Sequence, residues 1–175
     1  MNDEKIINSI NADYIGEPGN RRFYILVSKK SDAYLLWIEK DQLISLGRAC
    51  SKLLSDHVTK IEKSGKYLTN DIELPDDPDI EMNVIRIGVD YLTASGRIVI
   101  IFDDQESIEN GESPKLRIEI ERKLIHNFIN QTRELSASGR PTCPLCHEVV
   151  DENGNCNFCP KKNGHSKDAD IPKLI

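Results

Sequence analysis

The sequence predicts an α+β fold, in which an antiparallel sheet is built from two strand-strand-(strand)-helix halves and both helices cover one face. Two observations support this class. Runs rich in β-branched and aromatic residues are followed, twice along the chain, by a run whose apolar residues recur at three-to-four spacing. In addition, four of the five cysteines are confined to positions 143–159 of the 175 residues, which predicts a small C-terminal zinc knuckle or ribbon.

The first half is expected over residues 12–63. Residues 1–15 carry only a weak apolar pattern, and a Gly-Glu-Pro-Gly-Asn turn follows at 16–20. Two strands joined by a hairpin loop come next, and Asp41 is suited to cap a helix. The predicted strands cover 22–27 and 33–39, and the predicted helix covers 42–63. Both strands are apolar on both faces for part of their length, as in a sheet that is covered or dimerised. Cys50 and His57 fall on the apolar helix face, which favours structural roles for both.

The second half is expected over residues 82–139, after an acidic linker at 64–81. Gly139 is suited to end its final helix. The predicted strands cover 82–91, 97–102 and 116–120, with a second acidic loop at 103–112, and the predicted helix covers 122–137. The expected organisation is therefore an α+β domain over 1–139, a zinc-ribbon segment over 140–165 and a flexible tail over 166–175.

Two Cys-x-x-Cys pairs carry the sharpest chemical signal in the chain. Each pair can form a tight turn that directs two sulfurs at one point, and two facing pairs supply four thiolates in a tetrahedron. Such a site has no open position, so one zinc ion per chain would be structural. The surrounding glycines and prolines argue against a redox dithiol, which usually opens a helix after a strand. The expected ligands are Cys143, Cys146, Cys156 and Cys159. We expect His147 to lie outside the ligand set, and Lys161 and Lys162 to offset the negative charge of the site.

Charge and hydropathy narrow the classes of function. The formal net charge of −6 and the pI near 5.3 argue against strong non-specific binding to phosphate backbones. The sequence has no run of 18 apolar residues, so membrane insertion is not expected. The first residues lack the pattern of a signal peptide, and reduced metal-binding cysteines fit the same compartment. We therefore expect a cytoplasmic protein.

Three stretches resemble a bacterial family of uncharacterised proteins, classified as domain of unknown function three thousand and ninety. Its Gly-x-Pro-Gly-x-Arg-x-Phe opening is similar to residues 16–23, and its Leu-Glu-Lys-Glu-Gln junction is similar to residues 38–42. Its closing segment is similar to residues 138–165, a zinc-ribbon-like CPLC...C..CP segment in which Cys156 fills a position that is usually His. The resemblance runs over most of residues 12–165. It implies metal binding but no activity.

A weaker resemblance concerns architecture alone. The order of several strands followed by one helix occurs twice along the chain. This layout is similar to the double repeat of the PUR and Whirly single-strand-binding proteins. In those proteins, aromatic residues stack on bases and basic residues follow the backbone. The corresponding candidates here are Arg21, Arg22, Phe23, Tyr24, Lys29, Lys30, Tyr34 and Trp37. The alternative is that the aromatics belong to the core and that the lysines solvate a turn.

Three functions remain open on this evidence. The first is a non-enzymatic adaptor that binds another protein, with homo-oligomers allowed. The second is single-stranded DNA or RNA binding. The third is an enzyme in which the Gly16–Arg22 loop supplies Glu17 as a base and Arg21 and Arg22 as anion clamps, although the loop also reads as a structural turn. The sequence leans against an enzyme, because it contains no P-loop, dinucleotide fingerprint or His-Glu-x-x-His motif.

Overall fold

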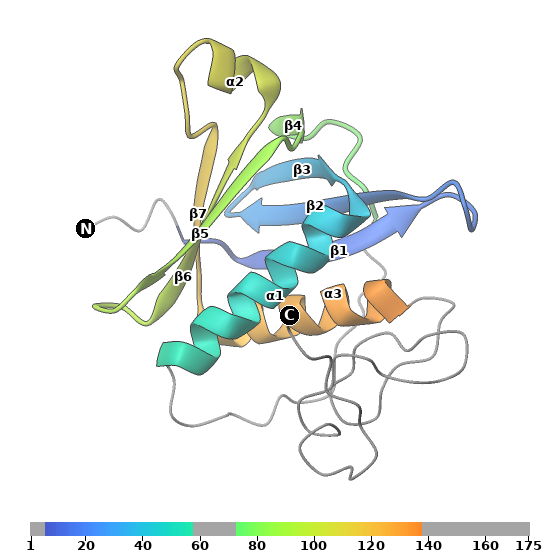
Figure 1. Cartoon of the computed structure of the whole chain (residues 1–175). Helices are drawn as coiled ribbons and strands as arrows, with labels where there is room; N and C mark the ends of the chain where they lie inside the picture. Colours follow the sequence, from blue (N-terminus) through green and yellow to red (C-terminus); the bar gives the residue numbers. More distant parts are fainter. Residues whose placement is uncertain (1–5, 58–72, 138–175) are drawn as a thin grey trace, which may run out of the picture. The chain divides into compact units, whose positions relative to one another are not determined.

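The α+β class is confirmed by the computed structural model, which describes residues 6–57 and 73–137 (Figure 1). The chain divides into two compact units, Met1–Thr132 and Arg133–Ile175. Both sheets of the described residues belong to the first unit. The predicted zinc ligands, the zinc-ribbon segment over 140–165, the tail over 166–175 and the first half of the acidic linker, residues 64–72, lie outside the described residues.

The first sheet has four strands in the order β1-β2-β3-β4. The strands β1, β2 and β3 are antiparallel, whereas β4 runs parallel to β3. The bounds are Ser9–Ile15 for β1, Arg22–Lys29 for β2, Asp32–Ile38 for β3 and Ile80–Asn83 for β4. Leu26 and Leu74 pack against a buried cluster of Tyr24, Leu35 and Trp37, so this sheet is covered on both faces within the chain.

Strand β4 shortens the predicted acidic linker at its C-terminal end. The Asp79 backbone N–H donates to the carbonyl oxygen of Ala33 at 2.8 Å, and the Ala33 N–H donates to the Asp79 carboxylate at 2.7 Å. These bonds fix the approach of β4 to the start of β3. The acidic composition of residues 64–81 predicted only a linker. Composition alone does not distinguish a loop from a short edge strand, so β4 was not predicted.

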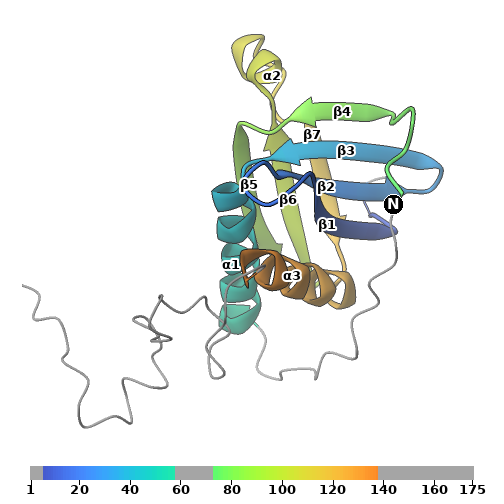
Figure 2. The same cartoon turned by 90° about the vertical axis from the view of Figure 1, so that its right-hand side faces the viewer.

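The second sheet has three antiparallel strands in the order β5-β6-β7, which cover Arg86–Leu92, Arg97–Asp103 and Leu116–Ile120. Its strands run in a different direction from those of the first sheet (Figure 2). The Val84 N–H donates to the carbonyl oxygen of Trp37, whereas the Ile85 N–H donates to that of Asp103, each at 2.8 Å. The chain therefore passes between the sheets within one peptide unit. The prediction of a single sheet was wrong, and the strand expected over 82–91 is two strands.

Three helices complete the described part of the chain. They are α1 (Lys40–His57), α2 (Gln105–Glu109) and α3 (Arg122–Ala137), and α2 lies inside the predicted second acidic loop. The Glu39 N–H donates to the side-chain oxygen of Gln42 at 3.1 Å, while the Glu39 carbonyl accepts from the Leu43 N–H. Glu39 is therefore the N-cap residue, and the side chain of Gln42, three positions further on, accepts its backbone N–H as in a capping box. The prediction that Asp41 caps this helix was wrong, since Asp41 lies in the first turn.

The helices α1 and α3 supply apolar side chains that cover the sheets. In Figure 1, α3 lies below the sheets and α1 runs diagonally down towards it. Leu43, Cys50, Ile125 and Phe128 are each 0 or 1% exposed. Burial raises the pKa of the Cys50 thiol to about 12, which keeps it protonated and unreactive. Its predicted role as a small core residue is confirmed.

The crossing of α1 and α3 depends on Gly47, and replacing this glycine tests the packing. A Cβ atom at position 47 would overlap the hydroxyl group and Cβ of Thr132. We expect Gly47→Ala to lower the free energy of unfolding by about 1–3 kcal/mol through overpacking, measured by chemical denaturation. Ser45→Ala, at an exposed position of the same helix, should leave stability nearly unchanged.

Thr132→Ala removes part of the overlap, so the double variant should lose less stability than the two single losses added together. Helix propensity alone predicts the opposite sign for Gly47→Ala, a gain of about 1 kcal/mol. Such a gain would contradict this description of the crossing.

Candidate functional site

The Gly16–Arg22 segment is a tight turn between β1 and β2, seen at the far end of that hairpin in Figure 1. The Asn20 N–H donates to the Glu17 carbonyl at 2.9 Å, and Gly19 between them has a φ of 88°. Pro18 followed by a glycine with positive φ is typical of a type II turn. Gly16 has a φ of 96°, and a Cβ atom there would overlap the Asn20 carbonyl oxygen. The turn geometry thus explains the residues of this motif.

The two arginines after the turn are each held over an aromatic ring. The Arg22 guanidinium lies 3.7 Å from the centroid of Trp37, and its Nη2 donates to the Asn83 side chain at 3.2 Å. The Arg21 guanidinium lies 4.3 Å from the centroid of Tyr14. Cation–π contacts of this kind are worth about 0.5–1 kcal/mol at exposed sites, and they fix the position of the charge.

A third cation lies at the same end of the sheet, where β1 ends and β2 and α1 begin. The Lys40 ammonium lies 5.9 Å from the ring centroid of Phe23, and Phe23 packs against Tyr14 at 5.8 Å between centroids. Ile15, the register partner of Arg22, is 42% exposed. Because side chains alternate along a strand, Arg22 and Ile15 lie on the same face of the sheet as Trp37, whereas Tyr14 and Phe23, with Arg21 and Lys40 over their rings, lie on the other face. We call the residues Tyr14, Ile15, Arg21, Arg22 and Lys40 at this end of the sheet the arginine platform. On one of its two faces, the fixed Arg22 cation lies beside an exposed aliphatic side chain.

The candidate base-stacking aromatics are buried. Phe23, Tyr24, Tyr34 and Trp37 are between 3 and 8% exposed, and the indole N–H of Trp37 donates to the Glu81 carboxylate at 2.8 Å. Lys29 and Lys30 lie at the opposite end of β2 from the arginines. The structure therefore favours core roles for these rings, which are not available to stack on bases in this conformation.

The enzyme hypothesis required Glu17 and the two arginines to act together. The structure uses the Glu17 backbone to close the turn and directs the arginines onto rings. His57 stacks on Tyr91 with 4.2 Å between ring centroids, at the end of α1, in agreement with its predicted structural role. Within residues 6–57 and 73–137, no group of three or more His, Cys, Asp or Glu side chains could hold a metal ion.

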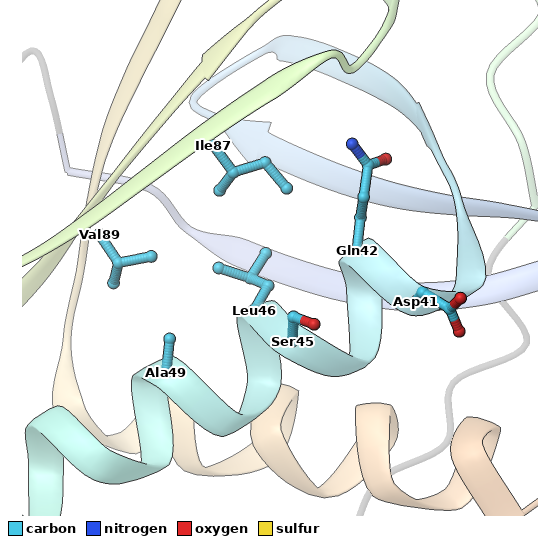
Figure 3. Close-up of a pocket in the computed structure, with 7 residues that line it drawn as sticks. All are labelled: Asp41, Gln42, Ser45, Leu46, Ala49, Ile87 and Val89. Atoms are coloured by element: carbon cyan, nitrogen blue, oxygen red, sulfur yellow. The ribbon is translucent and has the colours of Figure 1, made fainter.

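A groove lies between α1 and the edge strand β5, with a volume of about 430 Å³ (Figure 3). Ile87 and Val89 of β5 face Leu46 and Ala49 of α1 across it. Asp41, Gln42 and Ser45 continue its helical wall towards the start of α1. No pattern in the sequence predicts this groove, because the groove depends on how closely α1 approaches β5 in the fold.

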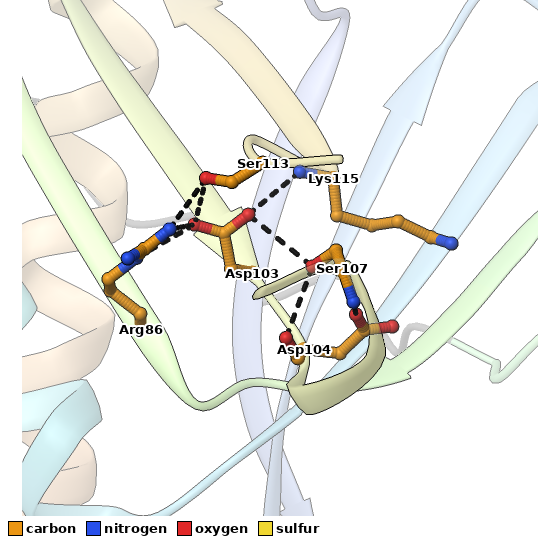
Figure 4. A network of polar contacts seen from close by, with 6 residues as sticks. All are labelled: Arg86, Asp103, Asp104, Ser107, Ser113 and Lys115. Carbon is orange, nitrogen blue, oxygen red and sulfur yellow. Dashed lines mark hydrogen bonds and ion pairs between the residues drawn. The ribbon is translucent and has the colours of Figure 1, made fainter. Parts of the chain in front are cut away.

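Asp103 is the centre of a polar network and is fully buried (Figure 4). Its carboxylate accepts hydrogen bonds from Arg86 Nε at 3.0 Å and Nη2 at 2.8 Å, from Ser113 Oγ at 2.9 Å, and from the Lys115 N–H at 2.9 Å. These groups come from β5 and from the segment before β7. The carboxylate therefore ties both neighbours of β6 to that strand.

The environment of Asp103 sets its charge state. Burial by itself raises the pKa, but the hydrogen bonds from Lys115, Arg86 and Ser113 outweigh it, so the pKa of Asp103 lies below its ordinary value. A buried carboxylate that stays ionised and accepts this many hydrogen bonds is a poor proton donor or acceptor near neutral pH. Its role is to hold the second sheet together.

Comparison with known proteins adds the family. Residues 5–159 match the model of a family described as Protein of unknown function (DUF3090). The chain belongs to this family. The resemblance was expected to run over most of residues 12–165. The DUF3090 match instead begins at residue 5 and ends at Cys159. Its zinc-ribbon segment is corrected as well, since the family description names no metal and the match does not support such a ribbon.

Two further comparisons were negative. No curated protein matches the chain, and no solved structure matches it. In the described part of this DUF3090 member, no helix is long and apolar enough to cross a membrane.

Replacing Asp103 tests its role as a structural carboxylate. Asp103→Asn keeps the size but removes the charge and turns an amide towards hydrogen-bond donors, so we expect a loss of about 3 kcal/mol in the free energy of unfolding at neutral pH. Because the folded pKa is lowered, this stabilisation is present above about pH 4 and is lost as the pH falls through the folded pKa. The difference between variant and wild type should therefore shrink on acidification in denaturation curves.

Asp104→Asn is the matched control. Asp104 accepts from the Ser107 N–H at 2.8 Å as the N-cap of α2, and asparagine caps helices about as well as aspartate. Equal losses in the two variants would show that Asp103 has no special role.

Proposed function

We propose that this DUF3090 member is a non-enzymatic interaction module that binds another protein through the arginine platform. The observation that carries the proposal is the fixing of Arg22 over Trp37, beside the exposed Ile15 on the same face of the sheet. Arginine and aromatic residues dominate the binding energy of many protein interfaces. An arginine already held in place loses less conformational entropy when it binds, so more of its interaction energy contributes to affinity.

The chemistry of the platform defines the partner. A guanidinium presents forked donors that match a carboxylate, and Ile15 supplies apolar contact next to them. A surface carrying Asp or Glu beside an aliphatic or aromatic side chain is the complement. Glu17 in the turn and Glu39 before α1 are both exposed, so the surroundings are of mixed charge. Mixed charge suits a protein surface better than a continuous phosphate backbone.

A structural zinc ion is the second part of the proposal. Cys143, Cys146, Cys156 and Cys159 have the spacing of two facing Cys-x-x-Cys turns, and four thiolates complete a tetrahedral shell. We propose one zinc ion per chain, which holds the C-terminal segment together and takes no part in chemistry. Thiolate ligands persist in a reducing compartment, so the proposal places the protein in the cytoplasm.

Binding by the platform is tested with Arg22→Ala and Arg22→Lys. A partner isolated from the native host with the full-length chain should bind Arg22→Ala at least tenfold more weakly, about 1.4 kcal/mol, because the forked donor is lost. Arg22→Lys should recover little, since an ammonium ion cannot replace the fork. Titration calorimetry supplies both dissociation constants.

The matched control is Lys52→Ala, which removes an exposed cation on α1 whose ion pair with Asp56 is 3.1 Å long. It should bind the partner like wild type. Equal weakening by the two alanine variants, or a chain that retains no partner, would rule out the platform as the binding surface.

The zinc site is tested by elemental analysis. Wild type should contain one zinc ion per chain, and Cys146→Ser should contain much less, with a C-terminal segment that proteases cleave faster because metal binding supplies folding energy. Cys50→Ser, which alters a buried thiol at another place, should keep its zinc. Wild-type protein without metal would refute this part of the proposal.

A further inference from the structure

We propose that β5 pairs with β5 of a second copy of this chain, antiparallel and about a two-fold axis at Gly88. The two three-stranded sheets would then form one continuous sheet. This inference concerns a surface other than the arginine platform and does not depend on it. It rests on the open edge of β5, on the side chains that line this strand, and on the charges at two of its positions.

Strand β5 is an edge strand, since among the described strands it pairs with β6 alone. An open edge presents backbone donors and acceptors that another strand can use. The residues of one face are apolar and incompletely covered: Ile85 is 51% exposed, and Ile87, Val89 and Tyr91 are half-buried. Side chains two residues apart lie on the same face of a strand, so these four form a continuous apolar stripe.

Antiparallel pairing about Gly88 matches this stripe with itself. Residues that face each other across such an axis are equally spaced on either side of position 88. Ile87 would therefore face Val89 of the second copy, and Ile85 would face Tyr91. Cross-strand pairs of β-branched and aromatic residues of this kind each contribute about 0.2–1 kcal/mol. The pairing would cover the most exposed large apolar side chain of the described residues, Ile85.

The opposite face of β5 carries complementary charges. Arg86 and Asp90 are both exposed and lie two residues on either side of Gly88. The same pairing places Arg86 opposite Asp90 of the second copy, and the symmetry makes this contact twice. Arg86 contacts Asp103 through Nε and Nη2, so Nη1 carries the donors that would face the partner. Asp90 accepts from the Tyr91 N–H through Oδ1, and Oδ2 would face the arginine.

The charge pattern of β5 favours a second copy of this chain over an unrelated strand as the partner. Charges on an edge strand usually discourage pairing, because like charges meet when two identical edges approach. Here, opposite charges are symmetric about the central glycine, so self-pairing brings unlike charges together. The groove between α1 and β5 lies beside the stripe, with Ile87 and Val89 in its wall (Figure 3). In the paired form, the apolar side chains of the second copy would extend the stripe at the open side of this groove.

The association state of the full-length chain tests the inference. Sedimentation velocity over a range of concentrations should show a monomer–dimer equilibrium that shifts towards monomer at high salt, because exposed ion pairs are screened. Asp90→Lys places two positive charges opposite each other and should raise the dimer dissociation constant at least tenfold. The control is Glu106→Lys, an equal charge reversal at an exposed position of α2, which should dimerise like wild type. Unchanged thermal unfolding of monomeric Asp90→Lys would show that the fold is intact.

Disulfide trapping tests the register. A mixture of Ile87→Cys and Val89→Cys chains should form mixed disulfides faster than either variant alone, because positions 87 and 89 are opposite each other, whereas 87 and 87 are offset. The native cysteines are the same in all these samples. A chain that is monomeric at every concentration, a dimer insensitive to Asp90→Lys, or equal trapping in all mixtures would overturn the inference. Monomers that capture a different protein at this edge would also overturn it.

Discussion

The architecture depends on the hydrogen bonds that Asp103 accepts from the chain where it leaves the first sheet. Its backbone carbonyl accepts from the Ile85 N–H, and its buried carboxylate accepts from Arg86, the next residue. Asp103 thus fixes Ile85 through its backbone carbonyl and Arg86 through its carboxylate. The same carboxylate holds the approach to β7 through Ser113 and Lys115.

The passage of the chain from the first sheet to the second also explains how the arginine platform is formed. Because the chain leaves the first sheet only after Val84, the preceding four residues are free to run as β4 beside β3. That placement brings Glu81 to the indole nitrogen of Trp37 and Asn83 to the guanidinium of Arg22. The ring over which Arg22 lies is therefore fixed by a segment far away in the sequence. A contact in the second sheet therefore supports the position of Arg22 on the first sheet.

Local patterns predicted most elements but not their partners. The β2–β3 hairpin, α1 and α3 follow from apolar spacing, since that spacing reflects one face of one element. The two sheets were missed although the sequence has a signal: Val84 and Ile85 are adjacent apolar residues, where one strand would alternate. Strand β1 was missed because its pattern is weak, and the cap of α1 was assigned to Asp41 because glutamate is an uncommon N-cap. The platform could not be predicted in full, because Asn83 reaches Arg22 only through tertiary structure.

The chain has a single tryptophan, and its position makes it a natural optical reporter. Trp37 is enclosed by Tyr24 on one side, by the Arg22 guanidinium on its face and by the Glu81 carboxylate at its nitrogen. The energy of the excited indole depends on the charges around it, and one of these charges, Arg22, belongs to the platform. Any event that moves Arg22 should change the colour or intensity of the emitted light. The molecule therefore reports on its own surface without an added dye.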